Sequence, residues 1–213
     1  MKIERFALGA LWTNAYLIYD SGSNGFFVDP GGDPEEAMGL IEDRGIMLKY
    51  VLLTHGHADH IAGLEKIRAE ATSGVLIHED DASMLESPES NLSAFVGEKL
   101  SLLPAERLFR DGDTFRVGDL SISVIHTPGH TRGSSCFLVE ESGGKGVLLS
   151  GDTLFAGSVG RTDLPGGDRD ILERSLSRLS ALPDEMKVFP GHGPATTIGA
   201  ERAGNPFWPE ERS

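Results

Sequence analysis

Three histidines and one aspartate lie close together in the stretch THGHADHIAG, which runs from Thr54 to Gly63. They are His55, His57, Asp59 and His60. Neutral imidazole and carboxylate are the ligands that zinc, iron and manganese prefer. A tight turn can point the first two histidines to one side and the other two ligands to the opposite side, which suits two adjacent metal ions better than one. The stretch therefore predicts a metal centre.

Single candidate ligands occur at three further places, each after a short run with the composition of a β-strand. They are His130, Asp152 and His192. The preceding runs are residues 120–125, 146–149 and 187–189, and residues 49–53 form a similar run before the histidine-rich stretch. Apolar and β-branched residues bounded by glycine-containing turns are typical of strands. Four strands that deliver ligands from their ends imply one site at the edge of a sheet, where open α/β sheets bind ligands.

The rest of the sequence predicts a chain in which strands and helices are mixed. We expect strands at residues 2–8, 14–19, 25–29, 75–78, 107–109, 114–117, 120–126, 134–140 and 146–150. We expect helices at residues 34–44, 61–71, 79–85 and 169–179, because apolar residues recur there with helical spacing. Asp33 and Asp168 have the residue type and position of N-caps. The strands at 107–109 and 114–117 are expected to open the second half of the chain.

Several residues near these strand ends allow more than one interpretation. The weakly patterned residues 87–103 either cover the mouth of the site or simply pack on the domain. Asp29, at the end of a strand, either orients a ligand histidine or forms a plain turn. His78 and His126 are expected to be strand residues rather than ligands.

Length and composition fit an ordinary globular protein, with 213 residues of which 39% are hydrophobic and 24% charged. We expect residues 1–213 to form a single domain. The net charge of −14 argues against nucleic acid as a partner and against binding to an anionic membrane. No apolar run approaches the length of a membrane span, and the first residues lack the clean apolar region of a signal peptide. A soluble, cytoplasmic protein is therefore expected, and its oligomeric state is left open.

In this order, the H-x-H-x-D-H stretch, the single histidine, the Gly-Asp pair and the Gly-His pair resemble the metallo-β-lactamase superfamily. Residues 151–168, 191–199 and 205–207 are similar to its short bacterial glyoxalase II-like (hydroxyacylglutathione hydrolase-like) members, and the similarity extends over nearly the whole chain. The resemblance implies an α/β (α+β) fold, a four-layer αββα sandwich of two mixed sheets with helices outside.

The resemblance also implies a role for each candidate ligand. One divalent metal ion would be held by His55, His57 and His130, and a second by Asp59, His60 and His192, with Asp152 bridging the two. A hydroxide shared by the metals would attack a substrate carbonyl, because metal binding lowers the pKa of water to about 7. Asp59 would also act in catalysis by accepting a hydrogen bond from the attacking water. Zinc, iron and manganese all suit such ligands, so the identity of the metal stays open.

The activity that the resemblance implies is hydrolysis of a small-molecule thioester of the hydroxyacylglutathione type. Arg161, in the loop after the bridging aspartate, could bind a substrate carboxylate; a salt bridge to Asp163 or Asp168 is the alternative. Larger glyoxalase II enzymes add a C-terminal helical domain that contacts glutathione. This chain ends at Ser213, so that domain is not expected and recognition of glutathione stays open.

Two other functions stay open at this point. One is hydrolysis of a different ester or of a lactone by the same chemistry. The other is a mono-iron persulfide dioxygenase, which needs only two histidines and one carboxylate, such as His57, His130 and Asp152. The stretches at 190–194 and 196–199 favour the hydrolase, because they resemble the short hydrolases.

Overall fold

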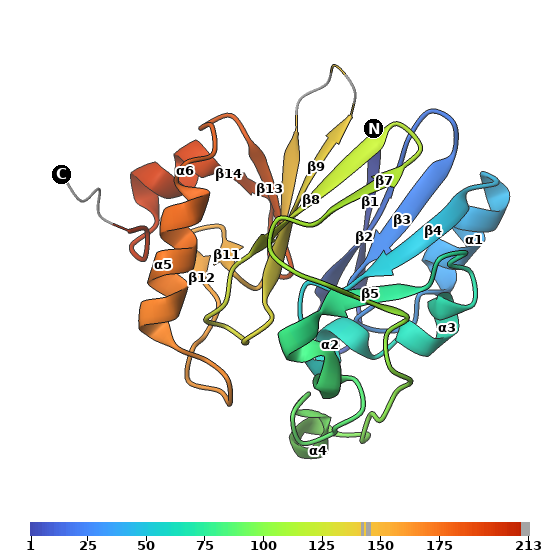
Figure 1. Ribbon diagram of the computed structural model, residues 1–213, viewed down its shortest axis with the longest axis horizontal. Coiled ribbons are helices and arrows are strands. Elements are labelled where there is room, and N and C mark those ends of the chain that lie inside the picture. The colour runs from blue at the N-terminus through green and yellow to red at the C-terminus, as the bar shows by residue number, and fades with distance from the viewer. Residues whose placement is uncertain (142, 144–145, 210–213) are drawn as a thin grey trace.

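Two six-stranded β-sheets pack face to face at the centre of the computed structural model, and helices cover the outer face of each sheet (Figure 1). The structure describes residues 1–141, 143 and 146–209. The layers follow the order helices, sheet, sheet, helices, so the predicted αββα sandwich of two mixed sheets is confirmed.

The first sheet is built from the N-terminal half of the chain. Its strands, in spatial order, are β1 (Lys2–Leu8), β2 (Thr13–Tyr19), β3 (Asn24–Val28), β4 (Met47–Leu52), β5 (Val75–His78) and β6 (Arg107–Phe109). The first three are antiparallel, whereas β3 to β6 run parallel. The connections contain α1 (Glu35–Asp43), α2 (Ala58–Ile61), α3 (Leu64–Arg68), the short 3-10 helix η1 (Glu79–Met84) and α4 (Ser93–Val96). Parallel strands bring their following loops to one edge of the sheet.

The second sheet is built from the C-terminal half of the chain. Its strands, in spatial order, are β14 (Thr196–Thr197), β13 (Lys187–Pro190), β10 (Val147–Gly151), β9 (Ser135–Glu141), β8 (Leu120–His126) and β7 (Thr114–Val117). The pair β10 and β13 is parallel, and the other neighbours are antiparallel. A small hairpin of β11 (Leu154–Phe155) and β12 (Ser158–Val159) precedes α5 (Arg169–Leu179), and α6 (Ile198–Gly204) follows β14.

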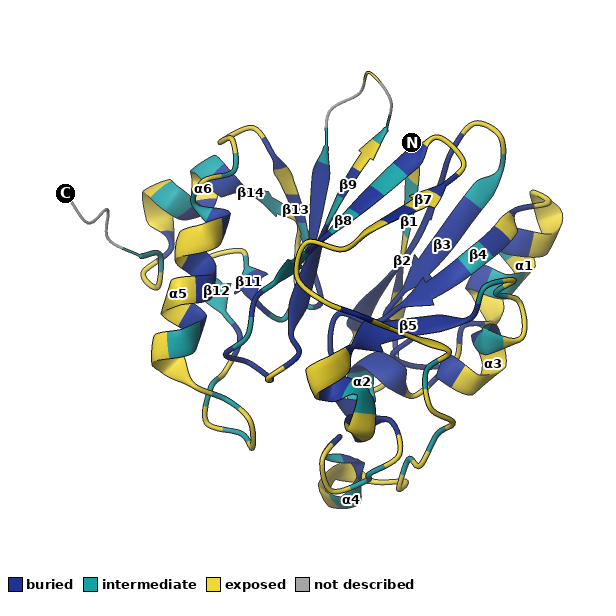
Figure 2. Cartoon of the chain, in the orientation of Figure 1, coloured by how far each residue is buried: buried dark blue, intermediate teal, exposed yellow. Residues whose placement is uncertain are grey.

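Three apolar clusters hold the four layers together. In β2, Leu17 belongs to the cluster under α1 and α3, whereas the adjacent Tyr16 belongs to the cluster between the two sheets. This alternation follows from the two-residue period of a strand. Leu172 and Leu176 of α5 close the third cluster on the outer face of the second sheet. Figure 2 shows the result: the central strands are buried, and the exposed residues lie on loops and on the outer sides of helices.

The prediction of a single helix at residues 61–71 is wrong, because α2 ends at Ile61 and α3 begins only at Leu64. Gly63 lies at the break and donates its N–H to the carbonyl of Pro30 at 2.7 Å. A Cβ at Gly63 would come within 1.8 Å of the carbonyl oxygen of Gly32. The backbone of this turn therefore packs directly on the loop after β3, and that tertiary contact interrupts the helix.

Two further predictions are corrected. Asp33 does not cap α1, whose N-cap position is Pro34 without a side-chain hydrogen bond. Asp33 instead forms an exposed ion pair with Lys66 at 2.6 Å. Residues 107–109 do not open the second half, because β6 pairs in parallel with β5 in the first sheet. The chain crosses to the second sheet only afterwards, through a turn in which Gly112 has a φ of +78°.

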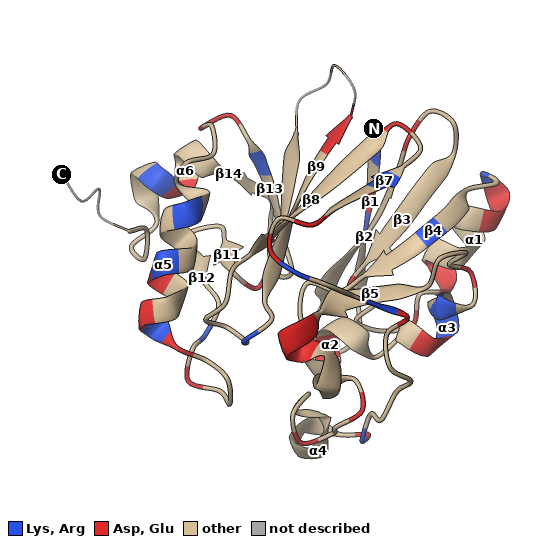
Figure 3. Cartoon of the chain, in the orientation of Figure 1, with Lys and Arg blue, Asp and Glu red and all other residues tan. Residues whose placement is uncertain are grey.

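Charged residues lie mainly on helices and loops, where acidic and basic residues are interspersed (Figure 3). Within the described ranges, no helix combines the length and the apolar character needed to cross a membrane. The single domain expected for residues 1–213 stays a prediction, and residues 210–213 lie outside the described residues.

Asp168 is the N-cap of α5, as predicted: its carboxylate accepts a hydrogen bond from the Ile171 N–H at 2.9 Å. We expect Asp168→Ala to lower the free energy of unfolding by about 1 kcal/mol, the usual effect of losing a cap. Urea denaturation measures this change. Asp170→Ala, in the first turn of the same helix, is the control and should cost no more than about 0.5 kcal/mol. Equal losses in the two variants would contradict the capping role.

Candidate metal centre and active-site cleft

The seven predicted ligands meet where the loops of the two sheets converge at one edge. They are His55 and His57 after β4, Asp59 and His60 on α2, His130 after β8, Asp152 after β10 and His192 after β13. The positions of these seven residues are thus consistent with the prediction that the ligands follow the ends of strands. Which ion each of them holds stays a prediction.

The first group consists of His55, His57 and His130. One ring nitrogen of each lies within 4.8 Å of the others. All three side chains are buried, and their ring centroids are 4.7 to 4.8 Å apart in edge-to-face arrangements. Three converging imidazoles are a frequent ligand set for zinc and related ions.

The second group consists of Asp59, His60 and His192, again with ligand atoms within 4.8 Å of one another. Asp59 Oδ2 lies 3.1 Å from His192 Nε2 and 3.6 Å from His60 Nε2. The side chains of Asp59 and His192 are 25% and 28% exposed, whereas that of His60 is fully buried. This group is therefore more exposed to solvent than the first.

Asp152 lies between the two groups. Its Oδ1 is 3.3 Å from His60 Nε2, and its Oδ2 is 3.7 Å from His130 Nε2 and 3.6 Å from His192 Nε2. The carboxylate therefore faces members of both groups at once. This is the position that a bridging ligand requires.

The donor atoms fit a pair of metal ions. Among the described residues, the buried atoms His55 Nε2, His57 Nε2, His60 Nε2 and Asp152 Oδ1 have no hydrogen-bond partner. Buried polar atoms are almost always paired, so four orphaned atoms in one place require an explanation. Two ions coordinated by these atoms provide that explanation, and the two clusters are suited to two metal ions.

Asp29 fixes the orientation of two candidate ligand histidines, His60 directly and His55 through Thr54. Asp29 Oδ2 accepts hydrogen bonds from the Thr54 hydroxyl at 2.6 Å and from His60 Nδ1–H at 2.9 Å. Since the Thr54 hydroxyl proton is committed to Asp29, its oxygen accepts from His55 Nδ1–H at 3.1 Å. In both histidines the proton sits on Nδ1, so the Nε2 lone pair points into the site. Of the two interpretations of Asp29, the structure therefore shows the orienting one.

A backbone carbonyl fixes the third histidine. His130 Nδ1 lies 2.8 Å from the carbonyl oxygen of Arg161, which can only accept, so Nδ1 carries the proton. His130 Nε2 can then only accept, and it lies 3.0 Å from His57 Nδ1 and 3.7 Å from Asp152 Oδ2. The loop that contains Arg161 is thereby joined to the first ligand group.

Asp81 joins the loops that carry the first group. Its carboxylate accepts hydrogen bonds from the Gly56 N–H at 3.1 Å, the Gly133 N–H at 2.7 Å and the Thr131 hydroxyl at 2.7 Å. Gly56 lies between His55 and His57, and Thr131 follows His130. The role of Asp81 could not be recognised in the sequence, because an Asp-Asp pair at the start of a helix is typical of an exposed first turn.

Electrostatics differ between the two groups. Burial lowers the pKa of His55 well below its ordinary value and lowers that of His57 to about 3. Burial alone would also lower the pKa of His60, but Asp152 and Asp59 raise it well above the ordinary value. Burial would raise the pKa of Asp152, yet the adjacent His60 lowers it. His55 and His57 thus offer neutral imidazoles, and a cation in the second group would take the place of a proton on His60.

Gly191 allows the chain after β13 to reach this cluster. A Cβ there would lie 2.3 Å from Asp152 Oδ1 and 2.7 Å from the His60 ring. Only glycine leaves room for these two ligands beside the backbone that carries His192.

His78 and His126 lie outside both ligand groups, as expected. Their rings stack on each other at 3.9 Å, and together with Asp80 they form a separate group of potential ligands. His78 Nδ1 accepts from the Asp80 N–H at 3.2 Å, and His126 Nε2 lies 2.8 Å from the carbonyl oxygen of Arg132. Two of the ring nitrogens are therefore already used in hydrogen bonds.

A cleft of about 530 Å³ opens above the ligand groups. Its floor contains His57, Asp59, His130, Asp152 and His192. Leu92, Phe95 and Val96 border it, whereas Leu100 and Leu102 pack against the core under the first sheet. Both interpretations of residues 87–103 are therefore correct, each for a different part of the segment.

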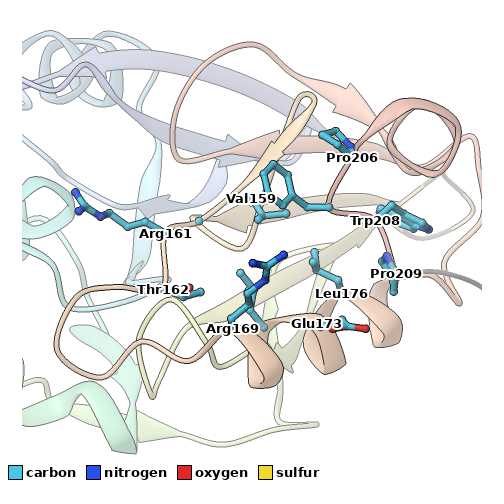
Figure 4. A pocket seen from close by; sticks show the side chains of 12 residues that line it. Val159, Arg161, Thr162, Arg169, Glu173, Leu176, Pro206, Trp208 and Pro209 are labelled. Atoms are coloured by element: carbon cyan, nitrogen blue, oxygen red, sulfur yellow. The ribbon is translucent and has the colours of Figure 1, made fainter.

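A second hollow, of about 440 Å³, lies between the loop after β12, α5 and the segment 206–209 (Figure 4). It contains none of the seven ligands. Arg161 borders both cavities, and its side chain extends away from the other residues of the hollow in Figure 4. The Arg161 guanidinium donates to the two oxygens of Asp163 at 2.8 and 2.7 Å. The salt bridge anticipated for Arg161 therefore exists at the rim of the cleft.

Asp81→Ala should destabilise the protein and weaken metal binding by the first group. The change leaves two buried backbone N–H groups without an acceptor, which should lower the free energy of unfolding by about 2–4 kcal/mol. Urea denaturation and metal analysis after dialysis measure the two effects. Asp80→Ala, at the exposed neighbouring position, should change stability by less than about 0.5 kcal/mol. A similar small effect in both variants would show that Asp81 does not hold the loops together.

Comparisons with known proteins agree with this geometry. The family model described as the Metallo-beta-lactamase superfamily matches residues 8–192. Hydroxyacylglutathione hydrolase GloC of Haemophilus influenzae is 35% identical over 212 residues, which cover 97% of this chain and 98% of GloC.

Two solved structures are similar over nearly their whole length. The BLEG-1 B3 metallo-beta-lactamase has a TM-score of 0.90 at 36% identity, with 97% of this chain and 99% of that chain covered. TTHA1623, solved in a di-iron-bound form, has a TM-score of 0.82 at 36% identity, with 96% and 99% covered. The fold, the order of the ligand-bearing loops and these similarities lead to one conclusion: the chain belongs to the metallo-β-lactamase superfamily.

Proposed function

We propose that this protein is a dinuclear metal-dependent hydrolase that cleaves thioesters of the hydroxyacylglutathione type. The observation that carries the proposal is the position of Asp152, whose oxygens face both ligand groups. A carboxylate between two groups supports a pair of adjacent ions rather than a single one. The similarity to GloC supports the thioester class, and the di-iron form of TTHA1623 supports the pair of metals.

The metals would supply a water molecule that ionises near neutral pH and a Lewis acid for the substrate carbonyl oxygen. The residues of the chain position the reactants around them. The hydrogen bonds to Asp29 and to the Arg161 carbonyl hold the imidazoles in the required tautomers. Asp59, which is partly exposed on the floor of the cleft, would accept a hydrogen bond from the attacking water and orient it.

Arg161 would bind a substrate carboxylate at the rim of the cleft. Its side chain is 60% exposed and is paired with Asp163, which is 68% exposed. Such an exposed ion pair contributes only about 0–1 kcal/mol, so a substrate carboxylate can replace Asp163 at little cost. Arg161 would then act in binding, while its backbone carbonyl continues to hold His130.

A second candidate activity is β-lactam hydrolysis, which the similarity to the BLEG-1 B3 metallo-beta-lactamase favours. Both activities open an acyl bond with an activated water, so the ligand groups suit either. The two activities differ in the chemical groups next to the scissile bond that the cleft must bind.

A substrate panel tests the proposal. The metal-loaded protein should hydrolyse S-lactoylglutathione or simple acyl thioesters faster than a chromogenic β-lactam. Faster turnover of the β-lactam would favour the second candidate. Oxygen uptake with glutathione persulfide, together with no turnover of any thioester or of the β-lactam, would contradict both hydrolase activities and indicate a dioxygenase.

Asp152→Ala should reduce the content of both metals, because it removes the one carboxylate that faces both groups. Loss of an indirect partner of a ligand already costs 10- to 100-fold in metal affinity, so loss of this direct ligand should cost at least about 100-fold. Elemental analysis after dialysis measures the metal content, and thioester turnover should fall with it. Asp163→Ala, an exposed aspartate at the same rim, should keep both metals. Two metals per chain in Asp152→Ala would refute the bridging assignment.

A further inference from the structure

The cleft above the ligand groups has an apolar rim that the proposed chemistry does not use. Leu11, Phe95 and Val96 all border it, and these side chains are 62%, 73% and 73% exposed. They are three of the eight large hydrophobic side chains that are strongly exposed in the described part of the chain. Several solvent-exposed apolar side chains beside a cavity indicate a surface that binds an apolar group.

The wall that carries Phe95 is fixed to the metal-binding motif. The buried side chain of Asn91 donates to the carbonyls of Met84 and Leu100, both at 2.9 Å. Its own backbone carbonyl accepts the N–H of Ala58, the residue between two candidate ligands, at 2.8 Å. The segment is thus tied to its neighbours on both sides.

Leu92 follows directly with a φ of +71°, a left-handed conformation that is costly for a residue with a Cβ. Such a conformation persists only where the surroundings impose it, and it is frequent at binding sites. The strained turn leads straight into α4, which carries Phe95 and Val96 into the rim.

The other walls of the cleft are fixed in a similar way. Leu11 lies two residues before Thr13, whose hydroxyl donates to Asp59 at 3.3 Å. Leu164 lies three residues after Arg161, whose carbonyl accepts from His130 at 2.8 Å. Both leucines therefore lie within three residues of a hydrogen bond to a candidate ligand.

Apart from the metal-ligand candidates, the described residues of the rim offer little charge. Arg161 is the charged side chain among them, and Asp163 neutralises it. We propose that the substrate carries an apolar group of several carbons next to its scissile bond, held by Leu11, Phe95 and Val96. This inference rests on the proposed thioester hydrolysis and extends its substrates from the hydroxyacylglutathione type to thioesters with an apolar acyl or thiol part.

Two substrate series test the inference on the metal-loaded protein. One varies the acyl chain from acetyl to octanoyl on a single thiol, and the other varies an alkyl thiol over the same lengths on a single acyl group. In one or both series, each methylene that leaves water should raise kcat/KM by up to about fourfold. Phe95→Ala should lower kcat/KM for the longest substrate of that series by about tenfold and change that for the shortest by less than about twofold.

Phe207→Ala is the matched control, because Phe207 is an exposed phenylalanine that borders only the second hollow. It should leave the dependence on chain length unchanged. A flat dependence in both series overturns the inference, and so does a rise that Phe95→Ala does not alter.

Equilibrium binding separates this inference from the hydrolase proposal. Calorimetry with linear carboxylates from acetate to octanoate should show affinity that increases with chain length in the metal-loaded protein, and Phe95→Ala should abolish the increase. If binding depends on chain length in this way but no thioester is turned over, the apolar site is supported and the proposed thioester hydrolysis is refuted. Length-independent binding together with thioester turnover overturns the apolar site and leaves the hydrolase intact.

Discussion

Four buried polar atoms of the candidate ligands have no hydrogen-bond partner among the residues that the structure describes. They are His55 Nε2, His57 Nε2, His60 Nε2 and Asp152 Oδ1. Leaving a buried polar atom unpaired costs about 1–3 kcal/mol, so concentrating four of them at one edge of the sheets is unfavourable for an empty fold. Binding of two cations removes this cost, which links the stability of the protein to the occupancy of its site.

The surrounding hydrogen bonds fix the direction in which the imidazoles of the site face. Asp29 and the carbonyl of Arg161 hold the Nδ1 protons of His60 and His130, so the Nε2 atoms present lone pairs. Asp81 joins the loop from the first sheet to the loop from the second. The two halves of the sandwich are thus connected at the same place at which they contribute ligands. A change in this network should alter metal binding even though it touches no metal directly.

Much of this arrangement could be predicted from the sequence, because it depends on local patterns. The apolar runs before Asp152 and His192 identify strands, and the density of histidines after β4 identifies a site. The spacing within residues 54–63 suggested two pairs of ligands, whereas the assignment of His130, Asp152 and His192 came from a family resemblance. The helix that breaks at Gly63 could not be predicted, because the cause is a contact with Gly32, far away in the sequence. The role of Asp81 was equally hidden, because its three partners come from two other loops.

Anomalous diffraction from crystals of the metal-loaded protein can show whether two metal ions share Asp152. We expect two anomalous peaks, one among His55, His57 and His130 and one among Asp59, His60 and His192. The Asp152 carboxylate should lie between them, within coordinating distance of both. A single peak at full occupancy, or two peaks of which only one contacts Asp152, would show that Asp152 does not bridge two ions.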